Sequence, residues 1–392
     1  MKSRLITIIL SFFTYIIVNA QSHNPYSHID NKIARMPDSL SRSTTKISEF
    51  ISTNFKSDEE KIRAIFYFTA TKINYDVENM FTLNSNKSSD EILKATLETR
   101  KGVCLNYAIV FNEISNKIGI KSVIINGYTK QRGKIDPIAH AWCGAFVDNK
   151  WFIYDPTWGA GYMANKKFIK KLNEQYYKSD PSKIIVTHMP FDYLWQFLNY
   201  PITNEEFYNG VTQINKSKTY FDYEKEIAHY DNYSEMVKLT TSIKRIELYG
   251  IKNAMIAEQI NYKKMQLENL KQAKLYEEFN KAIADYNEAV KQFNRFIDYR
   301  NKQFKPNVSD DEIKKMIEVP KTNLINTQYL LNNIGAIDKS NQKNLISIKQ
   351  SLSELLKQIE EQEVFVKDYL NKGKLGRKSM FTKYTWFGVQ LN

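Results

Sequence analysis

The chain has 392 residues, a formal net charge of +13 and only two cysteines. A chain of this length exceeds what one compact core usually organises, so we expect two domains. The sequence contains no phosphate loop and no dinucleotide-binding fingerprint. This argues against nucleotide cofactors, and we expect no cofactor of any kind.

The first twenty residues have the features of a secretory signal peptide. Lys2 and Arg4 precede an apolar run, which ends in small residues at Ala20. The run is too short for a membrane span. We therefore expect residues 1–20 to be cleaved and the protein to be secreted or periplasmic. For a basic protein in that compartment, peripheral contact with an anionic envelope surface is a better expectation than a nucleic-acid partner.

Residues 21–45 are polar and indicate a lead-in to a catalytic domain, which we place at residues 46–212. The most informative residue of this domain is Cys104, because Gly102 breaks the preceding segment and a helical pattern begins directly after the cysteine. The apolar residues of that pattern are Tyr107, Ala108, Phe111, Ile114 and Ile118. Cys104 is therefore expected at a helix start, where unpaired backbone N–H groups and the helix dipole stabilise a thiolate.

A β-hairpin is predicted next, with Asp148-Asn149 as the two-residue turn between residues 137–147 and 150–157. The register set by this turn places four residues on one face: His140, Trp142, Asp155 and Thr157. In that register His140 and Asp155 are diagonal neighbours, so their side chains are expected to meet.

The two cysteines are not expected to form a disulfide. Cys143 lies on the hairpin face opposite to His140, so a Cys104 that approaches His140 leaves Cys143 pointing away. The same parity argues against a zinc site made of these three residues, which would also need a fourth ligand. We expect no bound metal.

A thiol, an imidazole and a carboxylate that meet in one place favour a particular chemistry. A cysteine becomes a strong nucleophile as the thiolate, which needs a neighbouring imidazole, and an acid fixes the tautomer of that imidazole. Cys104, His140 and Asp155 therefore predict a cysteine acyl-transfer enzyme.

Three short motifs carry a resemblance to a known family. They are Gly-Val-Cys at 102–104, His-Ala-Trp at 140–142 and Asp-Pro-Thr-Trp at 155–158. They are similar to the core of the transglutaminase-like superfamily of papain-like cysteine enzymes. Further motifs, such as His-Met-Pro at 188–190, resemble the subgroup that contains kyphoscoliosis peptidase. The similarity extends over about residues 46–207.

The resemblance implies a fold and three residue roles. The fold is α+β, a papain-like or transglutaminase-like core in which the cysteine helix packs on an antiparallel sheet. The roles are nucleophile for Cys104, general base and acid for His140, and orienting group for Asp155. The partner is then a protein or peptide substrate.

The reaction remains open between hydrolysis and amine transfer. We favour a protease or amidase over a cross-linking transamidase, and we take three aromatic residues as candidate substrate contacts: Tyr75, Trp142 and Trp158. His188 is interpreted as a buried structural histidine. The alternative function is a non-catalytic scaffold, in which the papain-like domain binds a peptide and a helical arm positions it.

Residues 213–371 predict a second, all-α domain. Two stretches carry apolar residues at alternating spacings of three and four, namely 279–297 and 345–359, and Ser309 with Glu312 predicts a capping box for a short helix that ends before Pro320. We expect an antiparallel helical hairpin or small bundle, with self-association through the same seams as the alternative. Residues 372–392 form a basic and aromatic tail, which either docks on the catalytic domain or touches the envelope.

Overall fold

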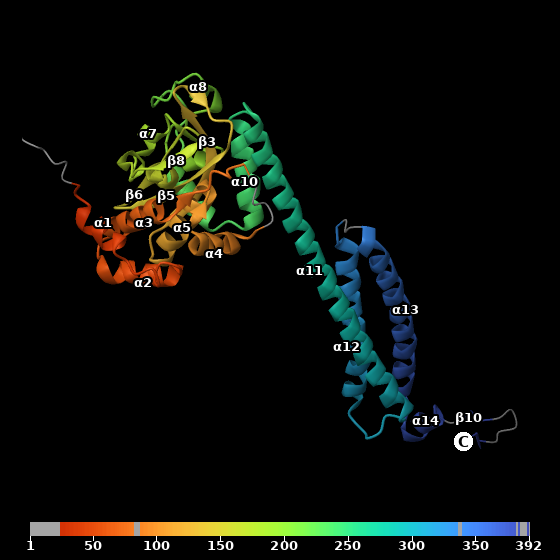
Figure 1. The fold of residues 1–392 in the computed structure, drawn as a ribbon. Coiled ribbons are helices and arrows are strands. Elements are labelled where there is room, and N and C mark those ends of the chain that lie inside the picture. The colour runs from red at the N-terminus through yellow and green to blue at the C-terminus, as the bar shows by residue number, and fades with distance from the viewer. Residues whose placement is uncertain (1–23, 82–86, 336–338, 382, 385–389, 392) are drawn as a thin grey trace, which may run out of the picture. The chain divides into compact units, whose positions relative to one another are not determined.

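The computed structural model describes residues 24–81, 87–335, 339–381, 383–384 and 390–391 (Figure 1). The predicted signal peptide, residues 1–20, lies outside them. Within the described ranges, no helix has both the length and the apolar character needed to cross a bilayer. The chain divides into two compact units, Met1–Tyr262 and Lys263–Asn392, so the boundary falls about fifty residues after the predicted one at residue 213.

The first unit contains the main sheet and the shorter helices that surround it. Its helices are α1 (Ser27–Ala34), α2 (Thr44–Asn54), α3 (Asp58–Lys72), α4 (Ser89–Thr99), α5 (Cys104–Lys117), α6 (Pro156–Ala160), α7 (Pro181–Ile184), α8 (Asn204–Tyr208), α9 (Tyr223–Asp231), α10 (Glu235–Leu248) and two 3₁₀ turns, η1 (Glu174–Tyr176) and η2 (Tyr193–Gln196). Its strands are β1 (Asn74–Tyr75), β2 (Lys101–Gly102), β3 (Ser122–Gln131), β4 (Lys134–Ile135), β5 (His140–Val147), β6 (Lys150–Tyr154), β7 (Gly161–Ala164), β8 (Lys167–Lys170) and β9 (His188–Pro190).

The main sheet is antiparallel, with the order β4-β3-β5-β6, and β9 also pairs with β3. Helix α5 packs against β3 and β5. Successive residues of β5 alternate between two cores. Ala141, Cys143 and Ala145 belong to the core shared with α3 and α5, whereas Trp142 belongs to a smaller core on the other face with η2 and α9. The sheet is therefore covered on both faces.

The predicted hairpin is confirmed in its register. Val147 pairs with Lys150 and Cys143 pairs with Tyr154, and the turn residues Asp148 and Asn149 both have positive φ, as a type I′ turn requires. Strand β6 ends at Tyr154 because Pro156 has no N–H to continue the ladder, and α6 begins there instead.

The polar lead-in predicted at residues 21–45 is in fact part of the first unit. Helix α1 buries Ile29 and Ile33 in the main core. Its Asp30 forms an ion pair with the fully buried Arg63 of α3. The sequence did not predict this helix because α1 has only eight residues and a polar outer face.

Helices α9 and α10 explain the displaced boundary. Arg245 of α10 forms a bidentate pair with Asp192, with N–O distances of 2.7 and 2.8 Å, and Ile227 of α9 enters the smaller core of the sheet. Both helices are thus extensions of the first unit, although their composition resembles that of the long helices after them.

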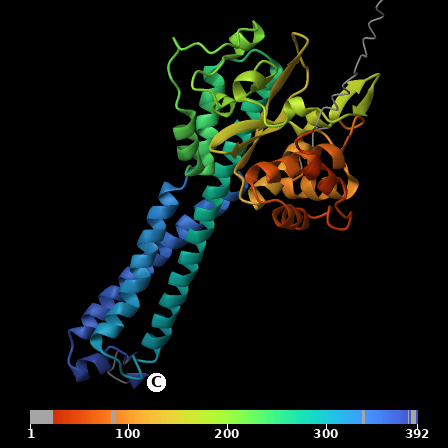
Figure 2. The same cartoon turned by 90° about the vertical axis from the view of Figure 1, so that its left-hand side faces the viewer.

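The second unit is a small helical bundle. It is made of α11 (Ala254–Asn301, of which the later part lies in this unit), α12 (Asp310–Asn333), α13 (Lys339–Leu370), α14 (Lys374–Ser379) and the strand pair β10 (Lys383–Tyr384) and β11 (Gln390–Leu391). The two predicted seams share one core within the chain, for example through Phe293 and Leu352. The long helices run side by side in both views (Figures 1 and 2).

Two details of the second unit differ from expectation. The capping box of Ser309 and Glu312 is present, but α12 continues through Pro320 instead of ending before it. Pro320 is buried in the unit, so packing outweighs the lost backbone hydrogen bond. The described part of the tail docks on its own bundle, since Arg377 forms a bidentate pair with Asp310 at 2.6 Å. Trp386 and Phe387, which the tail prediction also used, lie outside the described residues.

Candidate active site

Cys104 is the first residue of α5, as the sequence predicts. The residue before it, Val103, is extended, so the helix begins at Cys104. The N–H groups of its first residues therefore have no carbonyl of the same helix to bond. The side chain of Cys104 is half-buried. The N-terminus of a helix is a favourable place for a thiolate.

Asn106 holds the loop that leads to this cysteine. Its Oδ1 accepts the N–H of Val103 at 3.0 Å, and its Nδ2 donates to the hydroxyl of Thr96 at 2.7 Å. Gly102 is required at this point, because a Cβ there would lie 2.4 Å from the Cβ of Asn106. The preceding strand β2 pairs in parallel with β1, which brings Tyr75 beside Gly102. The sequence did not reveal this role of Asn106, which appears only in the structure.

His140 begins β5 and lies between the other two residues of the triad. Its Nε2 is 2.7 Å from Oδ2 of Asp155, and its ring lies near enough to Cys104 for the two side chains to shift each other's pKa. The structure therefore brings together all three residues that the sequence singled out.

Asp155 is fully buried and serves as the N-cap of α6. Its Oδ1 accepts the N–H groups of Thr157 and Trp158 at 2.9 and 3.0 Å. Its Oδ2 contacts His140 and also His188, whose Nε2 lies 3.1 Å away. Four donors on one carboxylate leave it no freedom to rotate, and they satisfy a charge that burial would otherwise make costly.

The charges of the triad follow from these contacts. Burial raises the pKa of the Cys104 thiol, but the interaction with the positively charged His140 outweighs burial and lowers this pKa overall. Burial lowers the pKa of His140, yet the Asp155 carboxylate raises it to about 10. Burial also acts to raise the pKa of Asp155, and the two histidines hold it well below its usual range. The arrangement favours a thiolate beside an imidazolium at neutral pH.

His188 is the residue whose part in the site the sequence did not reveal. It is buried, as the structural interpretation expected, but it is bonded to Asp155 rather than merely packed. Its Nδ1 lies 2.8 Å from the hydroxyl of Thr187. The signal available in the sequence was its place in a His-Met-Pro motif, which forms β9 beside β3.

The three aromatic candidates lie at different depths. Trp142 is only 1% exposed and packs against the rings of His140 and His188, so it is a support for the imidazoles and not a wall that a substrate touches. Trp158 is half-buried, with its ring 5.6 Å from that of His140. Tyr75 is half-buried, and burial, together with the charges of Cys104 and Asp155, raises its pKa to about 12. Tyr75 and Trp158 remain candidates for substrate contact.

The two cysteines are both free. Cys143 is buried and its sulfur donates to the carbonyl of Ala108 at 3.4 Å, so it packs on α5 one turn beyond Cys104. The parity of the strand alone does not separate the two thiols. Their separation along α5 does.

His140, Asp155 and His188 could also be considered as a metal site, because their ligand atoms all lie within 4.8 Å of one another. The contacts are those of a hydrogen-bond network, with both Nε2 atoms at 2.7 and 3.1 Å from the same carboxylate oxygen. A zinc ion would need about 2.0 to 2.2 Å to each of these atoms and would have to separate them. The donors therefore fit proton sharing better than metal binding.

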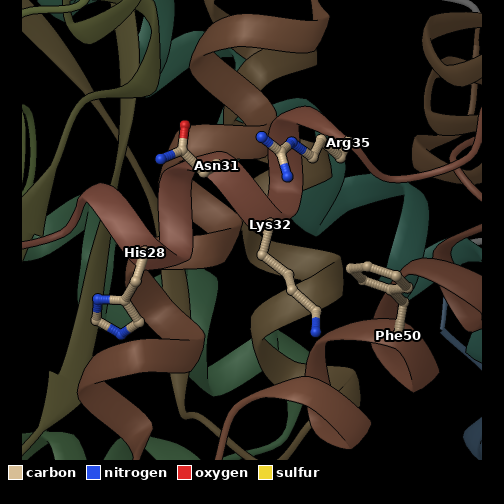
Figure 3. A pocket seen from close by; sticks show the side chains of 5 residues that line it. All are labelled: His28, Asn31, Lys32, Arg35 and Phe50. Atoms are coloured by element: carbon tan, nitrogen blue, oxygen red, sulfur yellow. The ribbon is translucent and has the colours of Figure 1, made fainter.

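A separate hollow of about 400 Å³ lies on α1 and α2 (Figure 3). Its lining is mainly basic and polar and consists of His28, Asn31, Lys32, Arg35 and Phe50. None of the triad residues lines it, so it is not the place where the thiol meets its substrate.

Comparisons with known proteins match the part of the chain that holds this site. Residues 45–156 match the model of the transglutaminase-like superfamily. Kyphoscoliosis peptidase of Mus musculus is 31% identical over 165 residues, which are 40% of this chain and 24% of that protein. Hillarin of Drosophila melanogaster is 26% identical over 176 residues, which are 39% of this chain and 20% of that protein. The chain thus spans about a quarter or less of the length of these relatives.

Among solved structures, a crystal structure of a TGase is 19% identical, with a TM-score of 0.25, over 42% of this chain and 40% of the other. The resemblance and the α+β fold inferred from the sequence, with a helical region after the core, are confirmed. We conclude that the chain carries a domain of the transglutaminase-like superfamily.

Proposed function

We propose that the first unit is a cysteine acyl-transfer enzyme that acts on amide bonds of peptides or proteins, as a protease or amidase rather than a cross-linker. The observation that carries this proposal is that Cys104, His140 and Asp155 come together, with His140 bonded to Asp155 at 2.7 Å and close enough to Cys104 to lower the pKa of its thiol. A buried carboxylate, an imidazole and a half-buried thiol in this order are the arrangement that activates a cysteine nucleophile.

In the first half of the reaction, the Cys104 thiolate attacks the amide carbonyl carbon and forms a tetrahedral intermediate. The oxyanion of that intermediate needs hydrogen-bond donors, and the first N–H groups of α5, those of Cys104 and Leu105, are suited to this role. His140 then gives its proton to the leaving amine, which departs and leaves a thioester on Cys104.

In the second half, a nucleophile resolves the thioester. His140, now neutral, takes a proton from a water molecule, and the resulting attack releases the acid and restores the thiol. If a primary amine attacks instead, the product is a new amide. Which of these prevails depends on how well the site excludes water.

The test is mass spectrometry of a peptide library incubated with the protein, with and without an added primary amine such as glycine ethyl ester. Cleaved peptides identify a protease, loss of a side-chain amide identifies an amidase, and amine adducts identify a transamidase. Cys104→Ala is the matched control. A library left unchanged by the wild type, with Cys104 labelled no faster than Cys143, would support the scaffold function instead.

Export is part of the proposal and is supported by the sequence of residues 1–20. The expected location is secreted or periplasmic, and the expected partner is a protein or peptide substrate. Cell fractionation of the full chain and of a variant that lacks residues 2–20 tests the location, because only the full chain should leave the cytoplasm.

A further inference from the structure

His188 is a second imidazole on the carboxylate of Asp155, and no step of the proposed reaction uses it. The ring is 1% exposed, and its Nε2 lies 3.1 Å from the same Oδ2 atom that contacts His140. A buried, titratable ring in direct contact with the orienting acid is more than a filler of space, because Leu or Phe would fill the same space without the cost of burying a polar ring.

The neighbours of His188 fix its tautomer. Asp155 is ionised, so the Nε2 that faces it must carry the hydrogen. The hydroxyl of Thr187 then donates to Nδ1 at 2.8 Å, in preference to the carbonyl of Ile184 at 3.2 Å. Burial lowers the pKa of His188, which keeps the ring neutral. The donor to Asp155 is thus a neutral N–H.

Aromatic rings also fix the position of His188. The centroid of its ring lies 4.7 Å from that of Trp158 and 5.1 Å from that of Trp142, both edge-on, and 5.9 Å from that of Tyr176. The carbonyl of Tyr176 also accepts the backbone N–H of Asp155 at 3.0 Å. His188 and Asp155 are therefore held by the same group of side chains.

We propose that His188 is a positioning residue, which acts through Asp155 by sharing Oδ2 with His140 and so limits how strongly the carboxylate holds the His140 proton. The inference rests on the proposed function, because this proton must leave His140 for the amine. A carboxylate with one donor fewer is more basic, so it retains the imidazolium more tightly and the imidazolium becomes a poorer acid.

This role predicts an unusual pair of effects for His188→Leu. The imidazolium becomes more stable, so the thiolate beside it becomes more stable too. The acid limb of the pH profile of Cys104 alkylation therefore moves to lower pH, by about half a unit to one unit. At the same time turnover of a peptide substrate falls roughly tenfold, because proton donation to the leaving amine is slower. A purely structural loss would lower both reactivities and leave the limb in place.

The experiment measures iodoacetamide labelling of Cys104 against pH, and turnover of the best peptide from the library, in the full chain. His188→Gln restores an N–H donor at similar reach and should bring both values to within about twofold of the wild type. Asp155→Asn should move the acid limb in the opposite direction, upward. Thr187→Val should give a smaller shift in the same direction as His188→Leu. This variant replaces His188→Leu in the experiment if the leucine variant does not fold.

An acid limb that is unchanged in folded His188→Leu and in Thr187→Val, or that moves upward in either, would overturn the proposal. If the limb moves down but no variant and no wild-type protein cleaves or modifies any peptide, the link between His188 and the triad stands and the proposed function fails. The two hypotheses are therefore distinguishable.

Discussion

The amide of Asn106 donates a 2.7 Å hydrogen bond to the hydroxyl of Thr96, which ties the first turn of α5 to α4. Thr96 is itself buried and donates to the carbonyl of Ile92 at 2.6 Å. The same amide side chain accepts the N–H of Val103, directly before Cys104. The nucleophile is thus held by a small, buried polar network.

Replacing Asn106 by alanine should lower the free energy of unfolding by about 1–3 kcal/mol, because the N–H of Val103 and the hydroxyl of Thr96 each lose a hydrogen-bond partner. It should also slow alkylation of Cys104, since the start of α5 loses its anchor. Urea unfolding and iodoacetamide labelling measure the two effects.

Asn116→Ala is the matched control. Asn116 bonds both backbone groups of Ser122 near the other end of α5, at 3.0 and 3.1 Å. It should lower stability without changing the labelling rate of Cys104. Equal labelling rates in Asn106→Ala and in wild type would show that the loop keeps its conformation without this anchor.

The two thiols should differ sharply in reactivity. Burial raises the pKa of Cys143 well above its usual value, whereas His140 lowers that of Cys104. Below the ordinary thiol pKa of about 8.5, native protein should therefore be alkylated at Cys104 alone.

Peptide mapping after a short exposure to iodoacetamide checks this expectation. Cys143→Ala should keep the labelling and activity of the wild type, and Cys104→Ala should lose both. Cys143 labelled in the native protein as fast as Cys104 would contradict the buried position of its sulfur.

Asp155→Asn should raise the pH at which Cys104 becomes reactive. The Asp155 carboxylate raises the pKa of His140 to about 10, and the imidazolium in turn lowers the pKa of Cys104. Without the carboxylate the imidazolium loses its proton at lower pH and the thiol regains a more ordinary pKa. Alkylation at pH 6 should then fall by about tenfold for each unit by which the thiol pKa rises above that pH.

The pH profile of labelling measures the shift, and the profile at high pH is the internal control. Above the ordinary thiol pKa, wild type and variant should be labelled at similar rates, since both are thiolates there. A variant that is slow at every pH would indicate a displaced ring and not a lost charge.

Much of the candidate site could be predicted from the sequence because it depends on short-range geometry. The turn at Asp148-Asn149 fixes the hairpin register, and this register brings His140 to Asp155. The position of Cys104 at a helix start follows from Gly102 and the apolar pattern after it. Each of these inferences needs only a few consecutive residues and the period of a strand or helix.

The parts that the sequence did not reveal depend on contacts between distant segments. His188 reaches Asp155 only because β9 pairs with β3, and no local pattern encodes that pairing. Helix α1 seemed a polar lead-in because its stabilising partner, Arg63, is 33 residues further along from Asp30. Pro320 seemed to end a helix because its buried environment is not visible in the sequence.

The buried Arg63 should be among the most important residues for stability in the first unit. Its guanidinium bonds both carboxylate oxygens of Asp30, at 2.8 and 2.7 Å, and also bonds Glu174 of η1. The rings of Tyr26 and Tyr177 lie against it, at 4.6 and 4.8 Å. It therefore joins α1, α3 and the turn whose end, at Tyr176, accepts the N–H of Asp155.

Arg63→Met should lower the free energy of unfolding by about 3–5 kcal/mol, because methionine keeps much of the side-chain volume but leaves the carboxylate of Asp30 buried and unpaired. Arg42→Met is the control, since Arg42 pairs with Asp38 at the surface and its loss should cost about 0–1 kcal/mol. Urea unfolding of both variants measures the difference. A cost for Arg63→Met as small as that for Arg42→Met would mean that water reaches Asp30 once the arginine is gone, and that α1 is held mainly by Ile29 and Ile33.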